Sequence, residues 1–137
     1  MNYELRLSKQ ITRDRLIEGI SSWFAVPIDK IMITEEITGD EDISGIFILG
    51  VYNQINGEFP TYLIIIDYQT QPGFGPEKKL AVKAAKYLDC RVLICTALDT
   101  ADPYVWDVVE RDGKLITVSV AADKLDDDGE FYIDKVL

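Results

Sequence analysis

Histidine is absent from all 137 residues of the chain, and this removes the commonest general base and metal ligand from consideration. Catalytic arrangements of the Ser-His-Asp or Cys-His type are therefore excluded, as are the usual structural zinc sites. No other catalytic arrangement is recognisable along the chain. We therefore expect a protein that is not an enzyme and that needs no metal or cofactor.

Cysteine and long apolar segments are scarce as well. Cys90 and Cys95 flank a strand-like run, so their side chains should point to opposite faces and remain reduced, buried thiols. The longest unbroken apolar run, from Tyr62 to Ile66, is far too short to cross a membrane. The first residues also lack the apolar stretch of a secretory leader. We therefore expect a cytoplasmic protein without membrane contact.

Basic residues are few: 14 lysines and arginines stand against 24 acids, giving a net charge of −10. A chain of this charge repels the phosphates of nucleic acids and anionic lipids, and it accelerates encounters with a basic partner. Solubility alone is the other explanation for an acidic composition. Nucleic acid is excluded as a partner, and a basic protein is the favoured one.

Apolar periodicity predicts two helices separated by strands. The first helix follows Thr12, which can cap it, and the second follows Pro76 and has an apolar stripe from Leu80 to Leu88. Alternating or continuous apolar residues predict strands over 2–8, 31–34, 44–55, 58–68, 91–95, 104–111, 114–121 and 131–136. We therefore predict a single α+β domain over residues 1–137, with a mostly antiparallel or mixed sheet and two helices packed on one face.

Two dipeptides predict tight hairpins. Asn56-Gly57 and Asp112-Gly113 are both typical of two-residue type I′ turns. The continuous apolar residues before and after the first turn predict strands that are covered on both faces. In the second hairpin, a two-residue turn pairs Arg111 with Lys114 and places Ser119 opposite Trp106. Tyr104 and Trp106 would then lie on the more polar face, where another segment or a binding partner would contact them.

Acidic residues are concentrated in two segments. Residues 98–130 have a net charge of −7 and residues 29–42 have a net charge of −5, whereas residues 76–91 are basic. Neither segment has the spacing of an EF-hand calcium loop, so they are interpreted as solvated charge or as a surface for a positive partner. The candidate partner-binding residues are Asp123, Asp126, Asp127, Asp128, Asp40, Glu41 and Asp42, together with Tyr104 and Trp106.

One alternative interpretation is enzymatic. The order hairpin, helix, strand resembles the core of restriction-endonuclease-like nucleases, in which an acid and a Lys or Gln two positions later hold magnesium on a central strand. Asp67 and Gln69 occupy such a position. The resemblance also implies an acid on the preceding strand, but residues 46–55 contain none. The metal would therefore have too few oxygen ligands, and an inactive relative of that fold remains an alternative.

In size, charge and texture the whole chain resembles bacterial immunity proteins, the small acidic partners of contact-dependent or polymorphic toxins. The resemblance lies in residues 102–109, which place Trp106 and Tyr104 among acids, followed by Asp112-Gly113 and residues 126–129. It implies a cytosolic inhibitor that binds a basic toxin domain, often a nuclease, at or beside its active site. An unspecified regulatory module is the remaining alternative.

Overall fold

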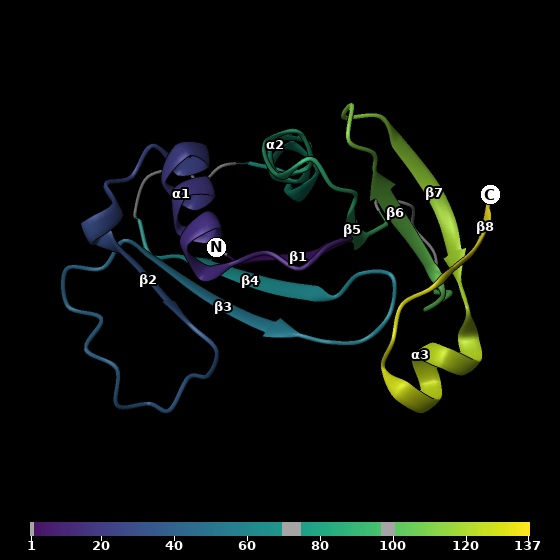
Figure 1. The fold of residues 1–137 in the computed structure, drawn as a ribbon, viewed down its shortest axis with the longest axis horizontal. Helices are drawn as coiled ribbons and strands as arrows, with labels where there is room; N and C mark the ends of the chain where they lie inside the picture. Colours follow the sequence, from purple (N-terminus) through teal and green to yellow (C-terminus); the bar gives the residue numbers. More distant parts are fainter. Residues whose placement is uncertain (1, 70–74, 97–100) are drawn as a thin grey trace.

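The computed structural model describes residues 2–69, 75–96 and 101–137, which form one eight-stranded sheet with three α-helices (Figure 1). The strand order is β2-β3-β4-β1-β5-β6-β7-β8, and all neighbouring pairs are antiparallel except β2 and β3. The strands are β1 (Asn2–Leu7), β2 (Ile31–Thr34), β3 (Ile48–Gln54), β4 (Thr61–Asp67), β5 (Val92–Cys95), β6 (Val105–Val109), β7 (Leu115–Val120) and β8 (Ile133–Val136). The predicted combination of helices with a mixed, mostly antiparallel sheet is confirmed.

Three helices are present in the described residues, where the sequence predicted two: α1 (Arg13–Phe24), α2 (Glu77–Leu88) and α3 (Ala122–Asp128). A short 3-10 turn, η1 (Ile28–Lys30), precedes β2. The segment α3 is not one of the two predicted helices, and four of its seven residues are aspartates. It folds as a helix because Leu125 packs against an apolar cluster and Gly129 supplies the left-handed residue that ends it.

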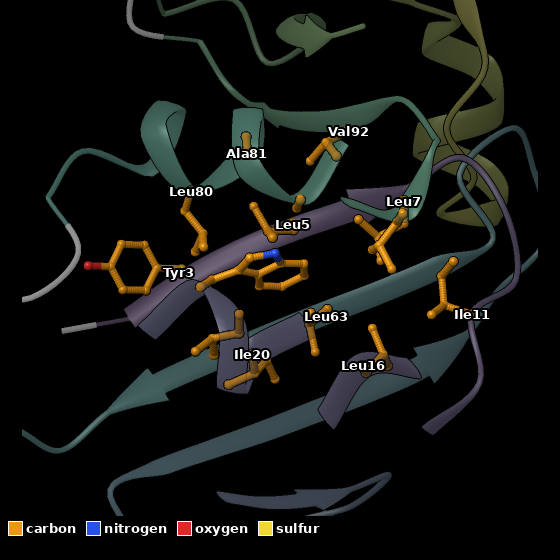
Figure 2. Close-up of a cluster of buried hydrophobic side chains, with 14 of the residues drawn as sticks. Tyr3, Leu5, Leu7, Ile11, Leu16, Ile20, Leu63, Leu80, Ala81 and Val92 are labelled. Atoms are coloured by element: carbon orange, nitrogen blue, oxygen red, sulfur yellow. The ribbon is translucent and has the colours of Figure 1, made fainter. Parts of the chain in front are cut away.

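The main core lies between the sheet and the pair α1 and α2. From β1, Tyr3, Leu5 and Leu7 project toward the helices, and Figure 2 shows them in one cluster with Leu80 of α2 and with Leu16 and Ile20 of α1. The predicted helix stripes are confirmed. The threonine cap is also confirmed, because Thr12 Oγ1 accepts a hydrogen bond from the Arg15 N–H at 3.2 Å.

A second core lies on the other face of the sheet, which we call the second face. Leu93 lies between Val92 and Ile94 on β5, so its side chain points away from α1 and α2. The buried members of this second core are Phe59, Leu93, Val108, Val118, Val120 and Phe131. It covers β5, β6 and β7, and α3 packs on it through Leu125.

The hairpin between β6 and β7 has a longer turn than expected. Val109 pairs with Leu115, and the Glu110 N–H donates a hydrogen bond to the Lys114 carbonyl. The loop between Glu110 and Lys114 therefore has three residues. Gly113 has a φ of +91°, as expected in a type I turn closed by a glycine bulge. One extra loop residue shifts the register by one, so the side chains of β6 share a face with the other set of β7 side chains. Trp106 therefore faces Val118, and the predicted pairing with Ser119 is wrong.

The turn between β3 and β4 is also wider than predicted. The Ile55 N–H bonds to the Pro60 carbonyl at 2.8 Å, so the loop spans residues 56–59 instead of Asn56-Gly57 alone. Two tertiary contacts favour the wider loop. Phe59 is fully buried in the second core, and the Glu58 N–H bonds to the carbonyl of Phe131 at 3.0 Å.

The three-residue turn can be tested at Asp112. A type I′ turn would require positive φ there, but among the described residues only Ala25 and Asp89 have positive φ besides glycines. Asp112→Gly should therefore lower the free energy of unfolding by about 1 kcal/mol, because the unfolded chain gains freedom and the bond from the Lys114 N–H is lost. Urea unfolding measures this change, and a stabilised variant would contradict the register described above.

Candidate interaction surface

The acidic residues predicted at the C-terminal end lie together on α3. Asp123, Asp126, Asp127 and Asp128 are all exposed, on a helix that packs on the second face. Asp126 Oδ2 accepts a hydrogen bond from the Tyr104 hydroxyl at 2.7 Å. Lys124 lies 3.8 Å from Asp128, an exposed pair that contributes little to stability. The helix therefore presents a negative surface of closely spaced carboxylates.

The other predicted acids, Asp40, Glu41 and Asp42, lie in the loop 35–47 between β2 and β3. The Thr38 N–H and the Gly39 N–H donate to the Glu41 carboxylate, at 2.6 and 2.9 Å. These bonds, the Thr38 one foremost, lower the pKa of Glu41, and the Ser44 N–H likewise lowers the pKa of Asp42. Both groups therefore keep their negative charge to lower pH than free carboxyls do.

The predicted aromatic residues contact the protein's own side chains. Trp106 packs edge-on against Phe131 with 5.0 Å between ring centroids, and its indole N–H donates to the Pro103 carbonyl at 3.0 Å. The interpretation that Trp106 stands on a polar face is wrong because of the register shift; it packs, half-buried, against the second core. Tyr104 packs there too, and its bond to Asp126 raises the pKa of its hydroxyl.

Arg6 forms the boundary of the second core. Its guanidinium carbon lies 4.1 Å from the ring centroid of Tyr62, 4.4 Å from that of Phe131 and 5.3 Å from that of Trp106. A cation–ring contact contributes about 0.5–1 kcal/mol at an exposed site and about 2 kcal/mol when it is shielded from water. The Tyr62 hydroxyl in turn donates to Glu4 at 2.9 Å. Sequence reasoning did not identify this stack, because Arg6 reads as the solvent-facing residue of an alternating strand.

Beyond Tyr62 none of the described helices lies over the second face (Figure 1). β3 and β4 pair there side by side, Leu49 with Ile66 and Val51 with Ile64. Leu49 and Val51 are buried, whereas Ile64 and Ile66 are half-buried and belong to neither core. The prediction that both strands are covered on both faces is therefore confirmed for residues 48–51 of β3, whereas β4 is only half-covered on this face. The Tyr68 N–H bonds to the Phe47 carbonyl, which extends the row by one more pair. We call the incompletely covered part of this row the open strip, and its members are Phe47, Ile64, Ile66 and Tyr68.

Exposure varies along the open strip. Phe47 and Tyr68 are 42% and 43% exposed, and Ile64 and Ile66 are half-buried. On the β1 side the strip is bounded by polar residues, since Ile66 pairs with Asn2 and Ile64 with Glu4. On the other side lies β2, followed by the acidic loop 35–47. The sequence signal for this surface was the continuous apolar run of β4, which has more apolar residues than one covered face requires.

Charge is separated between the two sides of the sheet. The exposed side of α2 carries Lys78, Lys79, Lys83 and Lys86, and a hollow of about 730 Å³ along it is lined by three of these lysines with Pro76 and Val82. In Figure 1, α1 and α2 lie above the sheet, whereas the loop 35–47 and α3 lie below it at opposite ends. The acidic groups singled out from the sequence are therefore on the side away from the lysines.

The candidate nuclease residues contact each other. Asp67 is buried at the end of β4, and its Oδ1 accepts from the backbone N–H and the side-chain amide of Gln69, at 2.9 and 3.2 Å. Within residues 2–69, 75–96 and 101–137, no group of three or more His, Cys, Asp or Glu side chains is placed to hold a metal ion. The two cysteines are also free, and Cys95 is exposed rather than buried as predicted.

Comparison with known proteins adds no relative: no family model, curated protein or solved structure matches the chain. In the part of the chain that the structure describes, none of the helices has the length and apolar character needed to cross a membrane.

The role of Trp106 in the second core is testable by comparing two variants. Trp106→Ala should lower the free energy of unfolding by about 3 kcal/mol, because it removes the contacts with Phe131 and Arg6. Tyr104→Phe, which loses only the bond to Asp126, should change it by less than about 1 kcal/mol. Urea unfolding of both variants measures the difference. Equally small changes in the free energy of unfolding for both variants would mean that Trp106 does not stabilise the second core and is available to a partner.

Proposed function

We propose that this protein binds and neutralises a basic protein, in the manner of the immunity proteins that protect bacteria from their own toxins. The observation on which the proposal depends is the charge separation across the sheet. Four exposed aspartates of α3 and the acids of the loop 35–47, of which Glu41 is half-buried, lie away from the lysines of α2. A surface of one sign, unlike scattered charge, steers a partner of the opposite sign into one orientation.

Immunity function fits the other properties of the chain. Acidic surfaces accelerate encounter with a basic toxin domain, and apolar contacts then slow its dissociation. The second face offers both, since the open strip lies on the same side as the acidic groups. Nucleic acid is disfavoured as a partner because phosphates are repelled by a net charge of −10.

Co-expression tests the function directly. The chain is produced in a bacterial host together with the toxin domain encoded beside its gene, and growth and complex formation are measured. We expect restored growth and a stable complex with a domain of net positive charge. Unrelieved growth arrest, or a bound partner that is acidic, would overturn the proposal.

The role of the α3 carboxylates can be separated from that of net charge. In the complex with that domain, Asp123→Asn/Asp127→Asn/Asp128→Asn should lower the association rate constant by roughly tenfold at low salt and flatten its salt dependence. The control Asp14→Asn/Glu18→Gln/Asp89→Asn removes the same charge from exposed positions on or next to α1 and α2. Stopped-flow kinetics should show little change for the control. Equal effects of both variants would mean that only the total charge matters.

A further inference from the structure

We infer that the partner docks on the open strip, and that it does so through an apolar segment flanked by lysine or arginine side chains. The inference rests on the proposed function, which supplies the positive charge of the partner. It adds the location of the contact and the kind of surface that the partner must bring.

The first argument is the uneven cover of the second face. Over β5, β6 and β7 the chain supplies its own covering layer from Phe59, Phe131 and α3. Over β3 and β4 the described residues give less cover: Leu49 and Val51 are buried, but Ile64 and Ile66 are only half-buried and Phe47 and Tyr68 are exposed. A row of this kind, ending in two exposed aromatic rings and bounded by polar side chains, is typical of a protein interface rather than of a solvated sheet.

The second argument is charge at the borders of the strip. Glu4 lies on β1 directly beside Ile64, and the loop 35–47 with Asp40, Glu41 and Asp42 follows β2 on the opposite border. Among the described residues, Lys30 contributes a cation–ring contact to the strip, with its Nζ 5.8 Å from the ring centroid of Phe47. Apolar residues between negative borders match a segment whose apolar side chains are flanked by positive ones.

The same borders argue against a second copy of this chain as the occupant. Two copies that met strip to strip would bring the acidic loops and Glu4 of both molecules close together. Like charges brought together at an interface oppose association by several kcal/mol. A basic partner meets no such repulsion, so it is the occupant that the charges favour.

The experiment uses the wild-type complex from the co-expression and two double variants. Phe47→Ser/Tyr68→Ser removes the two most exposed rings of the open strip and should raise the dissociation rate about 100-fold. Val136→Ser/Leu137→Ser is the matched control, because these apolar residues are 64% and 59% exposed at the other end of the sheet. The control should stay within about twofold of wild type. Circular dichroism and urea midpoints confirm that both variants fold.

The outcomes separate this inference from the function on which it rests. If the complexes of both double variants dissociate as slowly as the wild-type complex, the docking site is wrong and the proposed function still stands. Absence of any complex with a basic domain would overturn both. Sedimentation of the free chain provides a further check, since a dimer that the Phe47→Ser/Tyr68→Ser variant breaks would show that the strip binds a second copy instead. A variant that fails to fold is replaced by Tyr68→Ser alone, which should raise the dissociation rate about tenfold.

Discussion

The alternation of side chains along β1 is the constraint on which the rest of the structure depends. Tyr3, Leu5 and Leu7 point into the main core, so Arg6 must point to the second face. There it lies among the rings of Tyr62, Phe131 and Trp106, and these rings offset the loss of water around its charge. Because Arg6 occupies this position, the second core stops at β1. The apolar row of β3 and β4 is left outside it.

The two halves of the second face therefore have different roles. Over β5 to β7 the face is closed by Phe59, Phe131 and α3, and this closure fixes the helix that presents the aspartates. Over β3 and β4 it is apolar and bordered by acids. In the proposed interaction, the charges set the association rate constant, whereas the apolar contacts of the open strip set the dissociation rate constant. The lysines of α2 lie on the opposite side and would not repel a basic partner from this face.

Much of the fold could be predicted from local patterns. The strand from Ile31 to Thr34, the Thr12 cap and the buried stripe of α2 follow from short-range spacing, and the structure has them where the sequence places them. The turns could not be predicted from Asn56-Gly57 and Asp112-Gly113 alone. Those dipeptides specify a glycine with positive φ but not the number of residues around it, which depends on distant partners such as Phe131.

Those turn errors also explain why the candidate site was only partly predictable. Net charge and clusters of aspartate are visible in a sequence, so the acidic groups were found. The face on which Trp106 stands depends on a register of one residue, and that register was not visible. The open strip was interpreted as buried strand for a related reason: continuous apolar residues indicate cover on both faces, but they do not say which molecule provides it.

The central claim is that the open strip is only partly covered in the free protein and becomes fully covered in the complex. Methyl-detected NMR with a soluble paramagnetic relaxation agent measures this directly at isoleucine side chains. The account predicts that the Ile64 and Ile66 methyl signals broaden strongly in the free chain and become protected on binding, while Ile20 and Ile65 stay protected throughout. Protection of Ile64 and Ile66 in the free chain, or their continued exposure in the complex, would contradict it.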